Sequence, residues 1–361
     1  MSEHRQRRPQ LPQAATNPPS VPVDQMRIAR QLGIAQSTVS RALAGDPRIS
    51  RATRERVHRT AAALGYTPNF VARSLVTQQT RTIGVLLATT EYHFFALAAI
   101  AAQQRLMRDG YSTTLAVTDS RLDREREYVR FLAERQVDGL VVFSYSSQPA
   151  VEHLVRPVAR WPAIAVVNRY HDDPTIDTVM LGDVGGGRLV ADHLLSQGHR
   201  RIVILGLAPP SPASLGFVQG FHEVLASATV QPRPEDVVLS AKDVAAAREA
   251  TRAILRRDPT LTAVAAVSDV HAAGALQAAL ASGRRVPEDL AITGYDDTPG
   301  AIYTTPSLTS VRMPWELAGA RAAELVLARI GEPGRPAVHL DLACSLMVRE
   351  SSGGSLAPRH H

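Results

Sequence analysis

The 361-residue sequence has one cysteine, Cys344, and no apolar run that approaches the ~20 residues of a transmembrane helix. A single cysteine cannot form an internal disulfide, which fits a reducing compartment. The first 22 residues contain no apolar stretch of the kind that forms a secretory signal. Together these absences predict a cytoplasmic protein with no membrane segment.

Lysine is also nearly absent, because 39 of the 40 basic residues are arginine and Lys242 is the exception. Residues 1–81 contain 13 arginines and 4 acidic residues, a net charge of +9, whereas the rest of the chain carries −3. An arginine-rich codon bias explains the choice of arginine but not its position. A basic end on a slightly acidic body is typical of a DNA-binding head carried by a sensor or an enzyme.

Residues 25–44 predict a helix-turn-helix. Such a motif needs a small residue where its helices cross, a residue that tolerates a positive φ at the turn, and an apolar anchor under the second helix. Ala29, Gly33 and Val39 fill these three places. The rest of the second helix is polar, and we expect it to contact base edges and phosphates; its residues are Gln36, Ser37, Thr38, Ser40 and Arg41. An ordinary helical hairpin on a protein surface is the alternative.

Capping residues complete a three-helix head. Asp24 is a suitable N-cap for the first helix, and Ser50 for a third helix that runs to about Leu64 and ends at Gly65. Asn69 can cap a further short helix that carries Leu75 and is too short to be stable alone. We expect this segment to be a conditional hinge between two domains, with an ordinary connector as the alternative.

From Thr82 onward, short apolar runs alternate with amphipathic helices. The expected strands are 83–87, 113–117, 139–143, 163–167, 178–181, 202–205, a short one near 237, 263–267 and 290–293, and the expected helices are 94–108, 125–135, 150–160, 186–196, 217–227, 245–256 and 272–281. This alternation predicts parallel sheets covered on both faces. There are too many units for one compact sheet, so we expect two α/β lobes with a ligand between them at the carboxyl ends of the strands.

Other classes of protein fit less well. The 12 histidines form no His-Glu-x-x-His pair, and the glycines at 185–187 lack the spacing of a dinucleotide cradle, so we expect no metal, no cofactor and no enzyme activity. The serines around 144–147 do not form a nucleophile elbow. An exported binding protein would lack the basic head, and a structural nucleoid protein would leave the α/β core unexplained.

In combination and in order, several motifs resemble the lactose/galactose-repressor family of bacterial transcription regulators, from about residue 23 to residue 352. They are 28–34 (IARQLGI), 37–43 (STVSRAL), 49–57 (ISRATRERV), 64–69 (LGYTPN), 72–75 (ARSL), 194–202 (LLSQGHRRI) and 294–297 (GYDD). The resemblance implies a homodimer that binds a pseudo-palindromic operator on double-stranded DNA, and a small effector, by default a sugar, held between two lobes like those of periplasmic binding proteins. A repressor is expected more than an activator, because occupancy alone blocks a promoter.

The resemblance also implies roles for single residues. Gln36, Ser37 and Arg41 would face base edges, and Asn69, Ala72 and Leu75 would belong to a hinge helix whose Leu75 wedges open a base step in the minor groove. The effector residues expected are Phe94, Asn168, Arg169, Phe217, Lys242, Asp269 and Asp296.

Several positions depart from the family pattern. Ala35 replaces a hydroxyl residue that usually caps the recognition helix, and Asp24 replaces a phosphate-contacting threonine. Phe217 stands in place of an arginine, and Ser268 in place of an asparagine beside Asp269. For Lys242 a solvated helix-start lysine is favoured over an effector contact, and for Asp269 and Asp296 a loop or N-cap role is the alternative.

These expectations give the following domain organisation: a disordered tail (1–22), a helix-turn-helix domain (23–68), a hinge helix and linker (69–81), an amino-terminal lobe (82–181 with 315–342), a carboxyl-terminal lobe (182–314 with 343–352) and a polar tail (353–361). The final segment has no leucine heptads, so a dimer is expected without a tetramerising helix.

Overall fold

In the computed structural model, the structure describes residues 23–66, 74, 79–143, 151–155, 163–169, 171, 173–230 and 233–353. The chain forms two compact units, Met1–Thr77 and Gln78–His361, and each has its own hydrophobic core. The tail at 1–22 and the predicted hinge residues Asn69, Ala72 and Leu75 lie outside the described residues, so the hinge helix stays a prediction.

The first unit contains the predicted three-helix head, with helices α1 (Gln25–Leu32), α2 (Gln36–Leu43) and α3 (Arg51–Ala63). Ile28, Val39 and Val57, one from each helix, are fully buried in its core. Ala29 is buried as well, which allows α1 and α2 to cross closely. The helix-turn-helix and its third helix are therefore confirmed.

Local signals fix where these helices begin and end. The Asp24 carboxylate accepts a hydrogen bond of 2.8 Å from the Arg27 backbone N–H, and Ser50 Oγ accepts one of 3.2 Å from the Thr53 N–H. Gly33 ends α1 with φ of 65°, a left-handed conformation that glycine adopts without strain. Ala35 begins α2 without any side-chain cap, so one helix-terminal N–H group lacks the acceptor that a hydroxyl would supply.

Within its described residues, the second unit contains two six-stranded sheets, with strand orders β11-β5-β4-β3-β1-β2 and β12-β10-β9-β8-β6-β7. The first comprises β1 (Thr82–Leu87), β2 (Ser112–Val117), β3 (Gly139–Phe143), β4 (Ile164–Val167), β5 (Asp177–Met180) and β11 (His339–Asp341), and the second β6 (Ile202–Leu207), β7 (Val237–Ser240), β8 (Ala263–Ala266), β9 (Ala291–Tyr295), β10 (Thr309–Arg312) and β12 (Ser345–Met347). All described pairings are parallel except β10 with β12. The central strands are buried on both faces, as parallel sheets require.

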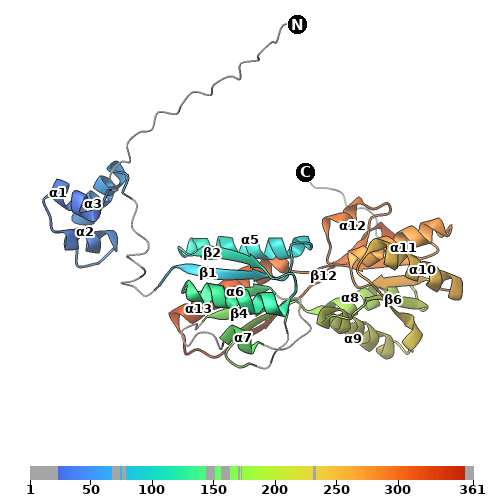
Figure 1. The fold of residues 1–361 in the computed structure, drawn as a ribbon. Coiled ribbons are helices and arrows are strands. Elements are labelled where there is room, and N and C mark those ends of the chain that lie inside the picture. The colour runs from blue at the N-terminus through green and yellow to red at the C-terminus, as the bar shows by residue number, and fades with distance from the viewer. Residues whose placement is uncertain are drawn as a thin grey trace, which may run out of the picture. The chain divides into compact units, whose positions relative to one another are not determined.

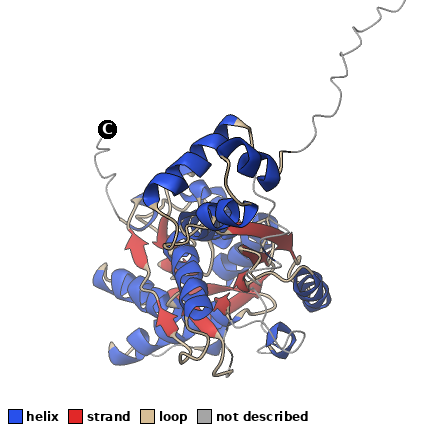
Figure 2. Ribbon diagram, turned by 90° about the vertical axis from the view of Figure 1, so that its left-hand side faces the viewer, coloured by secondary structure: helices blue, strands red, loops and turns tan. Residues whose placement is uncertain are grey.

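Helices flank both sheets (Figure 2). The lobe of the first sheet carries α5 (His93–Arg108), α6 (Leu122–Glu134), α7 (Glu152–Val155) and α13 (Trp315–Gly331), and the other lobe α8 (Asp183–Ser196), α9 (Pro212–Ser227), α10 (Val244–Arg257), α11 (Asp269–Ala281) and α12 (Pro299–Tyr303) (Figure 1). The chain passes from one sheet to the other after β5, after β10 and after β11. The predicted two-lobed α/β fold is confirmed, while the lobe boundaries stay predictions.

Glycines allow the closest helix pairs to form. A Cβ added at Gly187 on α8 would lie 2.0 Å from the Phe217 carbonyl oxygen on α9, and one at Gly220 would lie 1.9 Å from the Val184 carbonyl oxygen. Any larger residue would force α8 and α9 apart. The glycine run at 185–187 therefore includes a residue needed for helix packing.

Helix starts show where sequence reasoning was inaccurate. Helix α9 begins at Pro212, five residues before the predicted start, because Ser211 forms a capping box with Ser214 and proline is favoured at the first helical position. Helix α11 begins at Asp269, three residues early, with Ser268 as its N-cap. The predictions stop at residue 293 and so miss α12, β10, α13, β11 and β12.

Replacing Ala35 with serine supplies the missing cap of α2. We expect Ala35→Ser to stabilise α2 by roughly 0.5–1 kcal/mol, measured as slower amide hydrogen exchange along the helix. Ala62→Ser makes the same chemical change at an exposed position inside α3, where serine is less favourable than alanine by about 0.5 kcal/mol. Effects of the same sign for both variants would contradict the assignment of Ala35 as an uncapped N-cap.

Candidate functional site

The second helix of the head presents a polar face. Gln36, Ser37, Ser40 and Arg41 are exposed, and Thr38 is half-buried, while Val39 and Ala42 face the core. The predicted DNA-reading residues thus lie on one short helix whose apolar side is fully used in packing. Short donors and one guanidinium on such a face suit base edges and phosphates.

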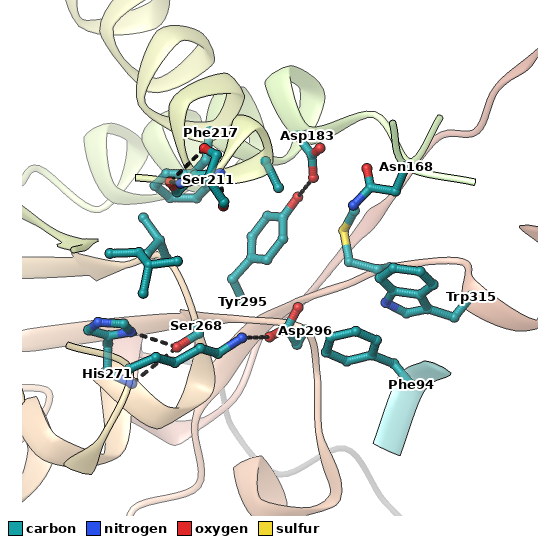
Figure 3. A pocket seen from close by; sticks show the side chains of 16 residues that line it. Phe94, Asn168, Asp183, Ser211, Phe217, Ser268, His271, Tyr295, Asp296 and Trp315 are labelled. Carbon is teal, nitrogen blue, oxygen red and sulfur yellow. Dashed lines mark hydrogen bonds and ion pairs between the residues drawn. The ribbon is translucent and has the colours of Figure 1, made fainter. Parts of the chain in front are cut away.

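In the second unit, a cavity forms where strands of both sheets end (Figure 3). Leu207, Lys242, Val267, Asp296 and Met313 reach it from segments at or just beyond the carboxyl ends of β6 to β10, and Asn168 follows β4. Its volume is about 30 Å³, which holds water but not a sugar ring. A second cavity of about 280 Å³ shares Phe94, Asp296, Met313 and Trp315 with it. The two cavities are therefore adjacent, with Phe94 and Trp315 in the linings of both.

Aromatic rings concentrate at this place, although aromatic residues are only 5% of the chain. Phe94 and Trp315 stack with centroids 4.5 Å apart and planes at 11°. Phe217 meets Tyr295 edge-on, with centroids 5.5 Å apart. Flat apolar faces of this kind bind rings, while polar groups around them fix orientation.

Lys242, the sole lysine, lies in the cavity rather than in solvent. Its side chain is 12% exposed, and its Nζ lies 3.7 Å from a carboxylate oxygen of Asp296. The same ammonium lies 4.0 Å from the ring centroid of Tyr92, a cation–π distance. The solvated-lysine alternative therefore does not describe this residue.

The two carboxylates of the cavity have perturbed acidity. Burial raises the pKa of Asp296 to about 7, although the nearby Lys242 ammonium lowers it. Burial also raises the pKa of Asp183 to about 6, despite the 2.6 Å hydrogen bond that its Oδ1 accepts from Tyr295 Oη. Asp296 has φ of 100°, a conformation that is strained for a non-glycine residue and that often marks functional positions.

Five of the seven predicted effector residues line this one cavity, namely Phe94, Asn168, Phe217, Lys242 and Asp296. Arg169 and Asp269 do not. Arg169 is buried and donates two hydrogen bonds, of 2.9 and 3.0 Å, to the Glu125 carboxylate. Asp269 accepts hydrogen bonds from the backbone and hydroxyl of Thr298 and from Ser310 Oγ. The polar groups of these two residues have partners within the fold, and their predicted effector role stays a prediction.

Sequence reasoning missed several cavity residues, including Asp183, His271, Tyr295 and Trp315. His271 is fully buried, with Nδ1 2.7 Å from Ser268 Oγ, and burial lowers its pKa. The rule that strand ends line the cleft would have found Tyr295. Trp315, one of only two tryptophans, lies beyond the last predicted element.

Comparison with known proteins agrees with this architecture. A family model described as "Bacterial regulatory proteins, lacI family" matches residues 27–69, and one described as "Periplasmic binding protein-like domain" matches residues 191–352. The chain is 34% identical over 336 residues to the HTH-type transcriptional regulator CelR of Thermobifida fusca, covering 90% of this chain and 96% of that relative.

The chain belongs to the LacI family of bacterial transcription regulators.

Solved structures of this family extend the likeness. A CelR–cellobiose complex matches with a TM-score of 0.69 at 29% identity, covering 91% of this chain and all (100%) of that one. A Lac repressor dimer bound to operator and the anti-inducer ONPF matches with a TM-score of 0.80 at 25% identity, covering 92% and 99%. Like them, this LacI-family regulator is a DNA-binding protein rather than an enzyme. Among its described helices, none is long and apolar enough to cross a membrane.

The raised pKa of Asp296 predicts a pH-dependent contribution to stability. Its pKa is about 7 folded and about 3.8 unfolded, so lowering the pH from 8 to 5 protonates the folded state first and stabilises it. On lowering the pH from 8 to 5, the free energy of unfolding of the wild-type protein should therefore rise by on the order of 2 kcal/mol relative to that of Asp296→Asn. Urea unfolding at the two pH values measures this difference. The exposed Asp123, whose pKa is lowered by Arg121, provides a control: Asp123→Asn should keep the wild-type change between these two pH values. An Asp296→Asn variant with the wild-type pH dependence would contradict the assignment.

Proposed function

We propose that this LacI-family regulator is a cytoplasmic repressor that binds a pseudo-palindromic operator as a homodimer, and that a small effector bound between its lobes controls this binding. One observation carries the proposal: a chain with a helix-turn-helix head also holds a largely enclosed Lys242–Asp296 pair in a cavity where both of its sheets end. A repressor is favoured over an activator because occupancy of a promoter is enough to block it.

Relatives support the operator, the dimer and the small effector of this proposal. One is a Lac repressor dimer bound to operator, and another is CelR with cellobiose. A ribose operon repressor of Haemophilus influenzae is 32% identical over 324 residues, covering 90% of this chain and 97% of that relative. We infer a sugar or related polyol as the effector class. The boundaries predicted for the head (23–68), the hinge (69–81) and the two lobes are part of the same proposal.

The proposed effector contacts are the five predicted residues that line the cavity. Lys242 and Asp296 offer a donor and an acceptor 3.7 Å apart, and Phe94 offers a ring face stacked on Trp315. Asn168, in a left-handed conformation with φ of 58°, adds an amide. Phe217 adds an apolar ring from α9, beside Ser214 of the same helix.

The proposed DNA contacts are the polar residues of α2 together with Asn69, Ala72 and Leu75 of the predicted hinge. Arg41 is the strongest candidate for a base contact, because it is exposed on α2 and can donate two parallel hydrogen bonds to guanine.

Removing Arg41 tests the head. An operator is first selected from random double-stranded DNA by the full-length protein. Arg41→Ala should then weaken operator binding by about 10- to 100-fold, corresponding to the loss of one bidentate base contact, as measured by fluorescence anisotropy. Arg126→Ala removes one exposed arginine from α6 in the core and should leave the affinity near the wild-type value. Equal losses in the two variants would contradict a specific role for Arg41.

Leu75 tests the hinge. If it wedges open a central base step, Leu75→Ala should lower the affinity for the selected operator and abolish DNA bending, because the unstacked step loses its apolar filler. Binding of a sugar to the core should change little, since Leu75 lies outside the second unit. Isothermal titration measures sugar binding, and a DNA-bending assay measures the effect on the operator. Parallel losses of DNA and sugar binding would contradict a separable hinge.

A further inference from the structure

The side chains that line the smaller cavity do not balance in charge. Two carboxylates, Asp183 and Asp296, and one ammonium, that of Lys242, face it among the described residues, and no arginine lines it. His271 lines it too, but burial lowers its pKa, so it is neutral near pH 7. Lys242 lies 3.7 Å from Asp296 and offsets that carboxylate. Asp183 is therefore the carboxylate without a cation.

Asp183 is held in unfavourable surroundings. It is 2% exposed, and its Oδ1 accepts a single hydrogen bond, from Tyr295 Oη. Its Oδ2 has no hydrogen-bond partner within the described part of the chain. Asp341 adds a second negative charge nearby and, with burial, keeps the pKa of Asp183 raised. A buried carboxylate oxygen without a donor or a cation is costly and rare in folded proteins.

A second unpartnered group lines the same cavity. Trp315 is 5% exposed and stacks on Phe94, and its Nε1 has no acceptor among the described residues. Two residues that line the cavity therefore carry an unused carboxylate acceptor and an unused indole donor. A ligand that satisfies both needs one group that donates and one oxygen that accepts.

The structure also shows how an ammonium is held here. Lys242 Nζ lies 4.0 Å from the ring centroid of Tyr92 and 5.8 Å from that of Phe94, beside Asp296. Aromatic faces combined with a carboxylate are the surroundings that bind ammonium groups. Asp183 also lies among aromatic side chains, since it accepts from the Tyr295 hydroxyl and Phe217 lies edge-on to Tyr295 (Figure 3).

We propose that the effector of this regulator is a polyhydroxylated molecule with one ammonium group, such as an amino sugar, whose ammonium binds the Asp183 carboxylate and one of whose oxygens accepts from Trp315 Nε1. The inference rests on the proposed function, because it assigns the ligand of that same cavity. A neutral sugar satisfies the hydrogen bonds but leaves the charge of Asp183 uncompensated. A sugar acid adds a third negative charge beside Asp183 and Asp296. The ligand's ammonium offsets the charge of Asp183, while Lys242 stays paired with Asp296.

A matched ligand panel tests this with the full-length protein near neutral pH. Glucosamine, galactosamine and mannosamine are compared with glucose, galactose and mannose, and with glucuronate and galacturonate, by thermal shift and isothermal titration. At least one amino sugar should raise the Tm and bind about tenfold or more tightly than its neutral parent, since a hydrogen bond to a charged group is stronger than a neutral one. This comparison needs no variant.

Asp183→Asn then tests the residue. The amide keeps an oxygen for the Tyr295 hydroxyl but removes the charge, so the preference for the amino sugar over its parent should fall to near unity. Removing the buried charge should leave the Tm of the ligand-free variant at or above the wild-type value. Asp192→Asn, an exposed change on the same helix α8, should keep the preference.

Three results would overturn the proposal: tighter binding of a neutral or acidic sugar than of its amino counterpart, no binding by any amino sugar, or an unchanged preference in Asp183→Asn. These results are distinguishable from failure of the proposed function. A neutral sugar that binds the core and changes operator affinity would leave the regulator assignment standing while refuting the ammonium. A protein that selects no operator would refute the assignment itself.

Discussion

Asp296 and Lys242 meet inside the core because the strands that precede them run parallel and end at the same edge of one sheet. Strands of the first sheet end at the same cavity, and Asn168, just after β4, lines it. Phe94 and Asp183 line it from the starts of the helices α5 and α8. Parallel strands oblige the connecting helices to begin at that edge, so capping residues and charged side chains gather there. The cavity and its buried charges follow from this one topological constraint.

Two lobes joined by the segments after β5, β10 and β11 are suited to a ligand-dependent change of state. Within the lobes, glycines such as Gly319, which lies against the Ala98 backbone, allow helix pairs to pack closely. The cavity is smaller than a sugar, so an occupant must move the lobes or the Phe94–Trp315 pair. A ligand that binds one arrangement better than another shifts the population between them.

Sequence patterns were enough to predict the features of this chain that depend on contacts between residues close in sequence. Asp24, Gly33 and Ser50 cap and end helices by contacts within a few residues, and the alternation of apolar runs with helices was enough for two α/β lobes. The ion pair of Arg169 could not be predicted, because its partner, Glu125, lies 44 positions earlier and no pattern links the two. Lys242 was ambiguous for the same reason, since Tyr92 and Asp296 reach it from distant strand ends. Trp315 lies in a helix beyond the predicted elements. Long-range partners decide which polar residue is free for a ligand.

The central claim is that occupancy of the cavity and operator binding are coupled. The most direct measurement is the affinity of a sugar that binds the core, taken with the protein free and with the protein saturated by its selected operator. Linkage requires the sugar affinity to change by the same factor by which the sugar changes operator affinity. We predict equal factors, each of about tenfold or more, given typical coupling energies. A sugar that binds free and operator-bound protein equally well would contradict the account.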